Sequence, residues 1–195
     1  RIHIEKHFFY FIFYRYLQSN LRCMKIILLG YMGSGKTTIG FQLANKLYLD
    51  FTDLDEYIEK KEGKTISGIF ADKGEIYFRK IEHTYLKQFI SENNSYVLSL
   101  GGGTPCYAGN IDMIIRQTKI QTIYLQASIA TIYERLYENS SKRPLLATLT
   151  KEGLTEYIAK HLFERGIYYE KAKYRISINS KSIEAIVAEI RILLH

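Results

Sequence analysis

A glycine-rich segment between an apolar run and a helical stretch constrains the fold of this 195-residue chain most strongly. Residues 30–37 read GYMGSGKT and match the phosphate-binding pattern G-x-x-x-x-G-K-[ST]. The glycines let successive backbone N–H groups curl around phosphate oxygens, and the helix that follows points its positive dipole end at them. A chance match is expected only about one time in a hundred. The segment therefore predicts ATP or GTP binding, and the alternative is a glycine turn without a ligand.

The residue types within this segment have distinct expected roles. Lys36 is expected to reach the β- and γ-phosphates, and the hydroxyl of Thr37 to contact Mg²⁺. The neighbouring residues expected to bind the nucleotide are Gly33, Ser34, Gly35 and Thr38.

Apolar runs and helical stretches alternate from residue 24 onward. Strands are expected at residues 25–29, 96–100, 120–125 and 175–178, and a shorter strand-like stretch precedes Asp53. Short apolar strands separated by helices imply parallel pairing through right-handed crossovers. The chain length favours one domain. We therefore expect a single-domain, doubly wound α/β fold.

Composition excludes several other classes. With 47% hydrophobic and 24% charged residues, the chain is typical of a globular protein and not of a disordered one. Cys23 and Cys106 form no CxxC motif, which favours a reducing compartment and a cytoplasmic location. The net charge is +7, yet residues 24–195 hold no block of Lys and Arg interleaved with aromatics. A nucleic-acid partner is therefore not expected.

Residues 1–23 form an aromatic-rich leader. Residues 8–16 hold seven of the 27 Tyr and Phe side chains, and the apolar run is far shorter than the roughly 20 residues that cross a bilayer. Because Met24 directly precedes the first expected strand, we favour upstream sequence outside the native protein. The alternative is an arm that touches a membrane or a partner.

Two carboxylates follow the short strand-like stretch. Asp53 and Asp55 lie one crossover beyond the glycine-rich segment, and the carboxyl ends of parallel strands converge on the ligand crevice. Both could face the γ-phosphate and its acceptor. The alternative is a helix N-cap with an acidic residue in the first turn.

Two further features could bind the acceptor. Arg79 and Glu82 share a helix face, so an ion pair could hold the guanidinium as a fork for a carboxylate. Gly101, Gly102 and Gly103 directly follow an expected strand and leave room for a ligand against the backbone. The alternatives are a solvated surface arginine and a plain loop.

Three more arginines are candidates, namely Arg135, Arg143 and Arg165. Arg143 lies in a stretch with turn signals, and an arginine on a mobile segment could close over the phosphates. The alternative is an ordinary charged loop.

Together these residues resemble the shikimate kinase family, a small branch of the nucleoside monophosphate kinase-like proteins. The resemblance covers essentially all of residues 24–195. It implies a P-loop kinase with a central five-stranded parallel sheet, helices on both faces and a mobile lid near residues 138–152. The motifs that carry it are, in order, GYMGSGKTT (30–38), DLD (53–55), IFADKGEIYFR (69–79), LGGG (100–103) and RPLL (143–146).

The resemblance implies phosphorylation of the shikimate 3-hydroxyl by ATP with Mg²⁺, in chorismate and aromatic amino acid biosynthesis, by a cytoplasmic monomer. It implies Lys36, Asp55 and Arg143 as catalytic residues, and Thr37 and Asp53 as metal-organising residues. Asp55 would also contact the shikimate hydroxyls and is the candidate base. Arg143 would be the lid arginine and Arg135 would pack on adenine. The implied shikimate-binding residues are Asp55, Arg79, Arg165 and Gly101, Gly102 and Gly103.

Other functions remain open at this point. A gluconate-type kinase shares the phosphate segment, and a regulatory or scaffolding module could bind nucleotide without transfer. A nucleic-acid-binding protein is suggested only by the charge. The chain also differs from the family after the last strand, where residues 178–182 lack its usual aspartate and proline.

Overall fold

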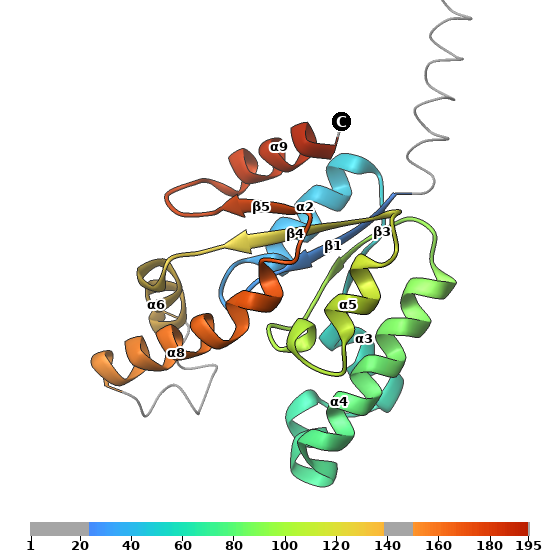
Figure 1. Ribbon diagram of the computed structural model, residues 1–195, viewed down its shortest axis with the longest axis horizontal. Helices are drawn as coiled ribbons and strands as arrows, with labels where there is room; N and C mark the ends of the chain where they lie inside the picture. Colours follow the sequence, from blue (N-terminus) through green and yellow to red (C-terminus); the bar gives the residue numbers. More distant parts are fainter. Residues whose placement is uncertain (1–23, 139–149, 195) are drawn as a thin grey trace, which may run out of the picture.

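Five parallel strands form a single sheet in the order β2-β3-β1-β4-β5 (Figure 1). The structure is a computed structural model, and it describes residues 24–138 and 150–194. The parallel sheet predicted from the alternating pattern is confirmed, and β1, β3, β4 and β5 lie within one residue of their expected bounds. No bounds were expected for β2, and Asp53 is its last residue instead of following it. These bounds are Lys25–Leu29 for β1, Phe51–Asp53 for β2, Tyr96–Ser99 for β3, Ile120–Gln126 for β4 and Tyr174–Ser177 for β5.

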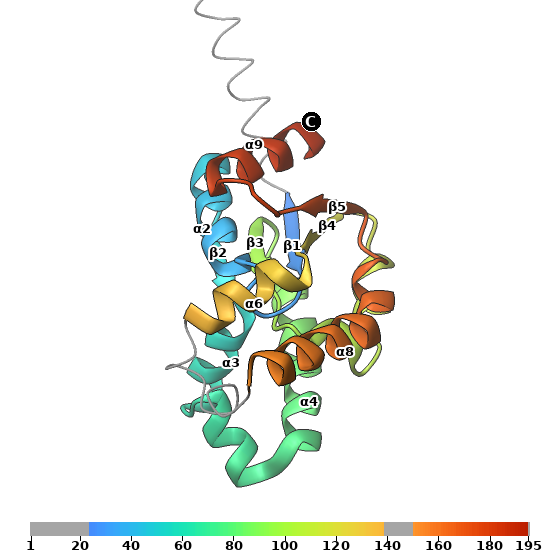
Figure 2. The same cartoon turned by 90° about the vertical axis from the view of Figure 1, so that its left-hand side faces the viewer.

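Helices cover both faces of the sheet, as expected. Helices α2 (Lys36–Leu47) and α9 (Ile183–Leu194) lie on one side, and α5 (Asn110–Ile115) and α8 (Lys151–Tyr169) lie on the other (Figures 1 and 2). The remaining helical elements are α3 (Leu54–Glu62), α4 (Ile66–Glu92), the 3₁₀ turn η1 (Thr104–Cys106) and α6 (Ile129–Glu138).

The central strand β1 shows why the sheet is parallel and covered on both faces. Ile26, Ile27, Leu28 and Leu29 are all 0% exposed, so neither face of the strand meets solvent. An antiparallel strand with one wet face would alternate apolar and polar residues, whereas a doubly covered strand is apolar throughout. The continuous apolar run of β1 therefore follows from its burial on both faces at the centre of the sheet.

The carboxyl ends of three strands place the functional segments at one edge of the sheet. β1 leads into the phosphate segment, β2 ends at Asp53, and β3 leads into the three glycines. In the strand register, Ser99 of β3 lies opposite both Leu28 of β1 and Asp53 of β2. Segments far apart in the sequence thus meet at this edge, where open α/β sheets bind ligands.

Helix α4 is bent at Gly74, which has φ 77° and ψ 175°. A Cβ atom at Gly74 would meet nothing within 4 Å, so the glycine is needed for its backbone conformation and not for space. The bend separates the first turns of α4 from residues 75–92, which carry Arg79 and Glu82.

Two expected segments lie outside the described residues. These are the leader, residues 1–23, and most of the expected lid, residues 139–149, which includes Arg143. Among the helices of the described part, none is long and apolar enough to span a bilayer.

Candidate active site

The phosphate segment forms a loop that is closed by the side chain of Lys36. Its ammonium group donates to the carbonyl oxygens of Gly30 at 2.8 Å and Tyr31 at 3.0 Å, and the residue is 8% exposed. Gly35, with φ 83°, occupies the N-cap of α2, so the cap itself places no side chain over the helix N-terminus. A glycine loop followed by a helix N-terminus is a ready binding site for phosphate oxygens.

Thr37 and Asp53 meet beside this loop. The hydroxyl of Thr37 donates to Oδ2 of Asp53 at 2.9 Å, and Oδ1 of Asp53 accepts from the backbone N–H of Asp55 at 3.0 Å. Asp53 is thus the N-cap of α3, as the alternative interpretation of the sequence expected, and its side chain also lies beside the phosphate loop. The cluster offers hydroxyl and carboxylate oxygens, which are the donors that Mg²⁺ prefers.

The carboxyl group of Asp55 lies in an unfavourable place for a negative charge. Burial raises its pKa from the ordinary value of 3.8 to about 6, with further contributions from the charges of Asp53 and Glu82. The nearby ammonium group of Lys36 opposes this rise. A partly desolvated carboxylate of this kind is suited to accept a proton from a substrate.

Two of the three glycines after β3 lie directly against charged groups, Gly101 against Asp55 and Gly103 against Arg79. A Cβ atom on Gly101 would lie 2.8 Å from Oδ1 of Asp55, and one on Gly103 would lie 2.9 Å from Nη2 of Arg79. Any larger residue would displace one of these two charged groups. The glycine run thus brings the carboxylate and the guanidinium to one turn.

Arg79 is held from several sides. Its Nη1 donates to Oε2 of Glu82 at 2.9 Å, its Nε donates to Oε1 of Glu75 at 3.4 Å, and its guanidinium lies 4.0 Å from the ring centre of Tyr107. The predicted pairing with Glu82 on one helix face is therefore confirmed. A guanidinium fixed in this way is a rigid fork for a carboxylate.

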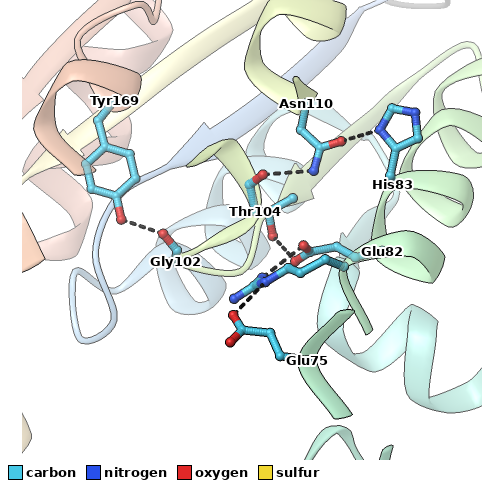
Figure 3. Close-up of polar contacts among 8 residues, drawn as sticks. Glu75, Glu82, His83, Gly102, Thr104, Asn110 and Tyr169 are labelled. Atoms are coloured by element: carbon cyan, nitrogen blue, oxygen red, sulfur yellow. Dashed lines mark hydrogen bonds and ion pairs between the residues drawn. The ribbon is translucent and has the colours of Figure 1, made fainter. Parts of the chain in front are cut away.

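Glu82 connects Arg79 to the glycine turn. Its other carboxylate oxygen accepts from the hydroxyl of Thr104 at 2.6 Å (Figure 3). Both Glu82 and Thr104 are almost fully buried. The carbonyl of Thr104 accepts from Asn110, whose Oδ1 lies 2.7 Å from Nδ1 of His83. Thr104 and Asn110 were not singled out from the sequence, because no local pattern marks such partners.

Tyr169 secures the other end of the turn. Its hydroxyl donates to the carbonyl oxygen of Gly102 at 2.5 Å from the end of α8 (Figure 3). The residue is 0% exposed, and burial raises the pKa of its hydroxyl well above the ordinary value of 10.0. The hydroxyl therefore stays protonated and remains a donor. No pattern in the sequence predicts this contact across 67 positions.

Arg165 and Arg135 approach the site from two other helices. The guanidinium of Arg165 lies 5.6 Å from the ring centre of Tyr31, and its Nη1 would be 3.8 Å from a Cβ atom on Gly102. Nη1 of Arg135 donates to the carbonyl of Gly33 at 3.2 Å. Arg165 thus lies by the glycine turn and Arg135 by the phosphate loop.

A cleft of about 780 Å³ runs along these elements. Arg79, Gly103 and Arg165 are not among its lining residues. Arg165 does lie near Gly102, which lines the cleft. Ile183 and Ile186 of α9 supply an apolar part that was not singled out from the sequence. The predicted site residues that line the cleft are Gly33, Gly35, Lys36, Thr37, Thr38, Asp53, Asp55, Gly101, Gly102 and Arg135.

The loop after β5 is anchored to the start of α6. Oδ1 of Asn179 accepts from the backbone N–H of Ser128 at 2.9 Å and from the hydroxyl of Thr131 at 3.0 Å. Asn179 thus holds in place the stretch that lacks the aspartate and proline of the family.

The sheet order, the loop after β1 and the oxygen cluster beside it define a P-loop protein of the nucleoside monophosphate kinase-like class. The family model described as shikimate kinase matches residues 32–194. The chain belongs to the shikimate kinase family.

Individual relatives agree with this assignment. A shikimate kinase of Flavobacterium psychrophilum is 49% identical over 170 residues, which cover 87% of this chain and 98% of the relative. A crystal structure of shikimate kinase from Bacteroides thetaiotaomicron has a TM-score of 0.81 at 34% identity, covering 88% of this chain and 98% of that one. Shikimate kinase from Acinetobacter baumannii, solved in complex with shikimate, has a TM-score of 0.79 at 32% identity and covers 91% and 96%.

Proposed function

We propose that this chain transfers the γ-phosphoryl group of ATP to the 3-hydroxyl of shikimate, giving shikimate 3-phosphate and ADP. The observation that carries this proposal is the glycine turn that holds Asp55 and Arg79 together beside the phosphate loop. The phosphate loop thus suits a triphosphate, and the glycine turn with Asp55 and Arg79 suits a small acid with hydroxyl groups. The reaction would belong to aromatic amino acid biosynthesis by way of chorismate, in the cytoplasm.

The acceptor side matches the chemistry of shikimate, which carries one carboxylate and three hydroxyls. Arg79 and Arg165 would bind the carboxylate as a pair of guanidinium groups. Asp55 and the backbone of Gly101, Gly102 and Gly103 would contact the hydroxyls. Because Glu82 already fixes Arg79, little ordering would be needed when the carboxylate binds.

The donor side would bind ATP through the loop and the start of α2. Lys36 would contact the β- and γ-phosphates, with Gly33, Ser34, Gly35, Thr37 and Thr38 around them. Arg135 would pack against adenine, and Arg143 of the expected lid would add positive charge next to the phosphates.

Thr37 and Asp53 would hold Mg²⁺ together with the phosphates. Their oxygen atoms, 2.9 Å apart beside the loop, fit a small hard cation. When bound, the ion would neutralise charge on the phosphate oxygens.

Asp55 would serve the acceptor. The 3-hydroxyl oxygen forms a bond to the γ-phosphorus while the bond to the β-phosphate oxygen breaks and ADP leaves. The proton of the hydroxyl goes to the carboxylate of Asp55, whose raised pKa suits this transfer. Positioning and charge neutralisation supply most of the rate enhancement in reactions of this type.

The test is ADP release by the full chain with ATP and Mg²⁺, measured with shikimate, with gluconate and without an acceptor. We expect turnover that requires shikimate. Turnover with gluconate alone would favour the gluconate-type kinase. ATP binding without turnover of either acceptor would favour a nucleotide-binding module.

A further inference from the structure

Tyr31 has a buried hydroxyl group that phosphate binding does not explain. The residue occupies a position that the phosphate-binding pattern leaves open, and its side chain is 1% exposed. Its hydroxyl lies 3.0 Å from Nδ1 of His161, which is 130 positions away on α8. The side chain therefore joins the phosphate loop to a helix on the other side of the site.

Tyr31 also contacts Lys36, which would bind the phosphates of ATP, and Arg165, which would bind the acceptor. Its backbone carbonyl accepts from the ammonium group of Lys36 at 3.0 Å. Its ring centre lies 5.6 Å from the guanidinium carbon of Arg165. His161 and Arg165 are four positions apart on α8, so they share one face of that helix. Tyr31 thus touches this face at two points.

His161 is itself held in place by a neighbouring ring. The ring of Tyr157 packs edge-on against it with 4.1 Å between the ring centres. Burial, followed by the charge of Arg165, lowers the pKa of His161, which favours the neutral ring beside Arg165. A neutral imidazole can form a hydrogen bond with a buried tyrosine hydroxyl, as donor or as acceptor.

We propose that Tyr31 is a positioning residue for the acceptor, which it serves by fixing Arg165 of α8 relative to the phosphate loop. The hydrogen bond to His161 fixes the tyrosine ring, and the ring limits where the guanidinium of Arg165 can lie. This inference rests on the proposed function, in which Arg165 binds the carboxylate of shikimate. The backbone of Tyr31 belongs to the phosphate loop, but its hydroxyl would affect acceptor binding through Arg165.

The test is steady-state kinetics of the full chain with ATP and shikimate varied separately. Tyr31→Phe removes only the hydroxyl, and His161→Leu removes its partner. We expect each variant to raise the KM for shikimate about 3- to 10-fold, the effect of one lost hydrogen bond, with the KM for ATP changed less than about twofold. The double variant should be no worse than the stronger single variant, because both remove the same contact.

Two further variants separate positioning from general damage. His161→Asn places an amide oxygen near the position of Nδ1 and should restore most of the shikimate affinity. Tyr96→Phe is the matched control, since Tyr96 is also 1% exposed and its hydroxyl has no hydrogen-bond partner among the described residues. This control should leave both KM values unchanged.

Several outcomes would overturn the inference while the proposed function stands. These are an unchanged KM for shikimate in Tyr31→Phe, equal rises in the KM for ATP and for shikimate, or additive effects in the double variant. A wild-type chain that does not phosphorylate shikimate would overturn the proposed function, and this inference with it.

Discussion

Arg79 and Glu82 form an ion pair in which Nη1 and Oε2 are 2.9 Å apart, although the side chain of Glu82 is only 1% exposed. A buried carboxylate is costly unless its oxygens are hydrogen-bonded. Here both oxygens are used, one by Arg79 and the other by Thr104. The guanidinium of Arg79 is thus held in one position without any ligand.

Arg79→Lys should be far from conservative, because an ammonium group cannot form two parallel hydrogen bonds to a carboxylate. We expect a loss of about 2 to 4 kcal/mol in transition-state binding, which is roughly a 30- to 1000-fold decrease in kcat/KM for shikimate. Arg175→Lys is the control, since Arg175 forms an exposed surface ion pair with Glu170. An unchanged kcat/KM in Arg79→Lys would remove Arg79 from the site.

The glycine turn allows a paired prediction. Gly101→Ala pushes a methyl group against Asp55 and should lower kcat by about tenfold or more. Gly103→Ala pushes against Arg79 and should instead raise the KM for shikimate by about the same factor. Gly166→Ala is the control, because a Cβ atom there meets nothing within 4 Å. If both variants of the turn kept wild-type kinetics, the turn would not position these groups.

Asp55→Asn should separate transfer from nucleotide binding. The amide cannot accept the proton of the acceptor hydroxyl, so kcat should fall by about 10²- to 10⁴-fold. The dissociation constant for ATP, measured by calorimetry, should change far less than kcat, since Lys36 keeps its hydrogen bonds to the carbonyl oxygens of Gly30 and Tyr31 in this variant. Turnover close to the wild-type rate would show that Asp55 is not the base.

Asp55 should also destabilise the fold at neutral pH. Its pKa is about 6 in the folded protein against 3.8 ordinarily, so the folded state binds more protons than the unfolded state between about pH 4 and pH 6. The free energy of unfolding should therefore fall as pH rises through this window, by up to about 3 kcal/mol. Above about pH 6 the loss in the free energy of unfolding caused by Asp55 should stay constant.

Thermal unfolding tests this in protein free of metal and nucleotide, with a chelator present. Asp55→Asn has no charge to bury. The gain in thermal stability of this variant over the wild type should be small near pH 4, grow up to pH 6 and then level off. An advantage that is the same at every pH would mean that the carboxyl group of Asp55 is not strained by burial.

Much of the fold follows from local signals in the sequence. Residues close together in the sequence determine the apolar run of β1, the glycine loop and the start of α2. These elements can therefore be predicted from local patterns. The ion pair between Arg79 and Glu82 was also predictable, because positions three apart share a helix face. The bounds of β1, β3, β4 and β5 were predicted to within one residue for the same reason.

The partners that hold the site in shape could not be predicted. Tyr169 reaches Gly102 across 67 positions, and Tyr31 reaches His161 across 130. Hydrophobic periodicity says which face of a helix is buried but not which polar group it meets there. The burial of Glu82 could likewise not be predicted from the sequence, since a glutamate on a helix is exposed in most proteins.

The position of the new phosphate ester tests the proposed reaction most directly. After incubation of the full chain with ATP, Mg²⁺ and shikimate, phosphorus and proton NMR should show one phosphate ester on the 3-hydroxyl, formed in equal amount to ADP. Release of ADP without a phosphorylated shikimate, or an ester on a different hydroxyl, would contradict the proposed reaction.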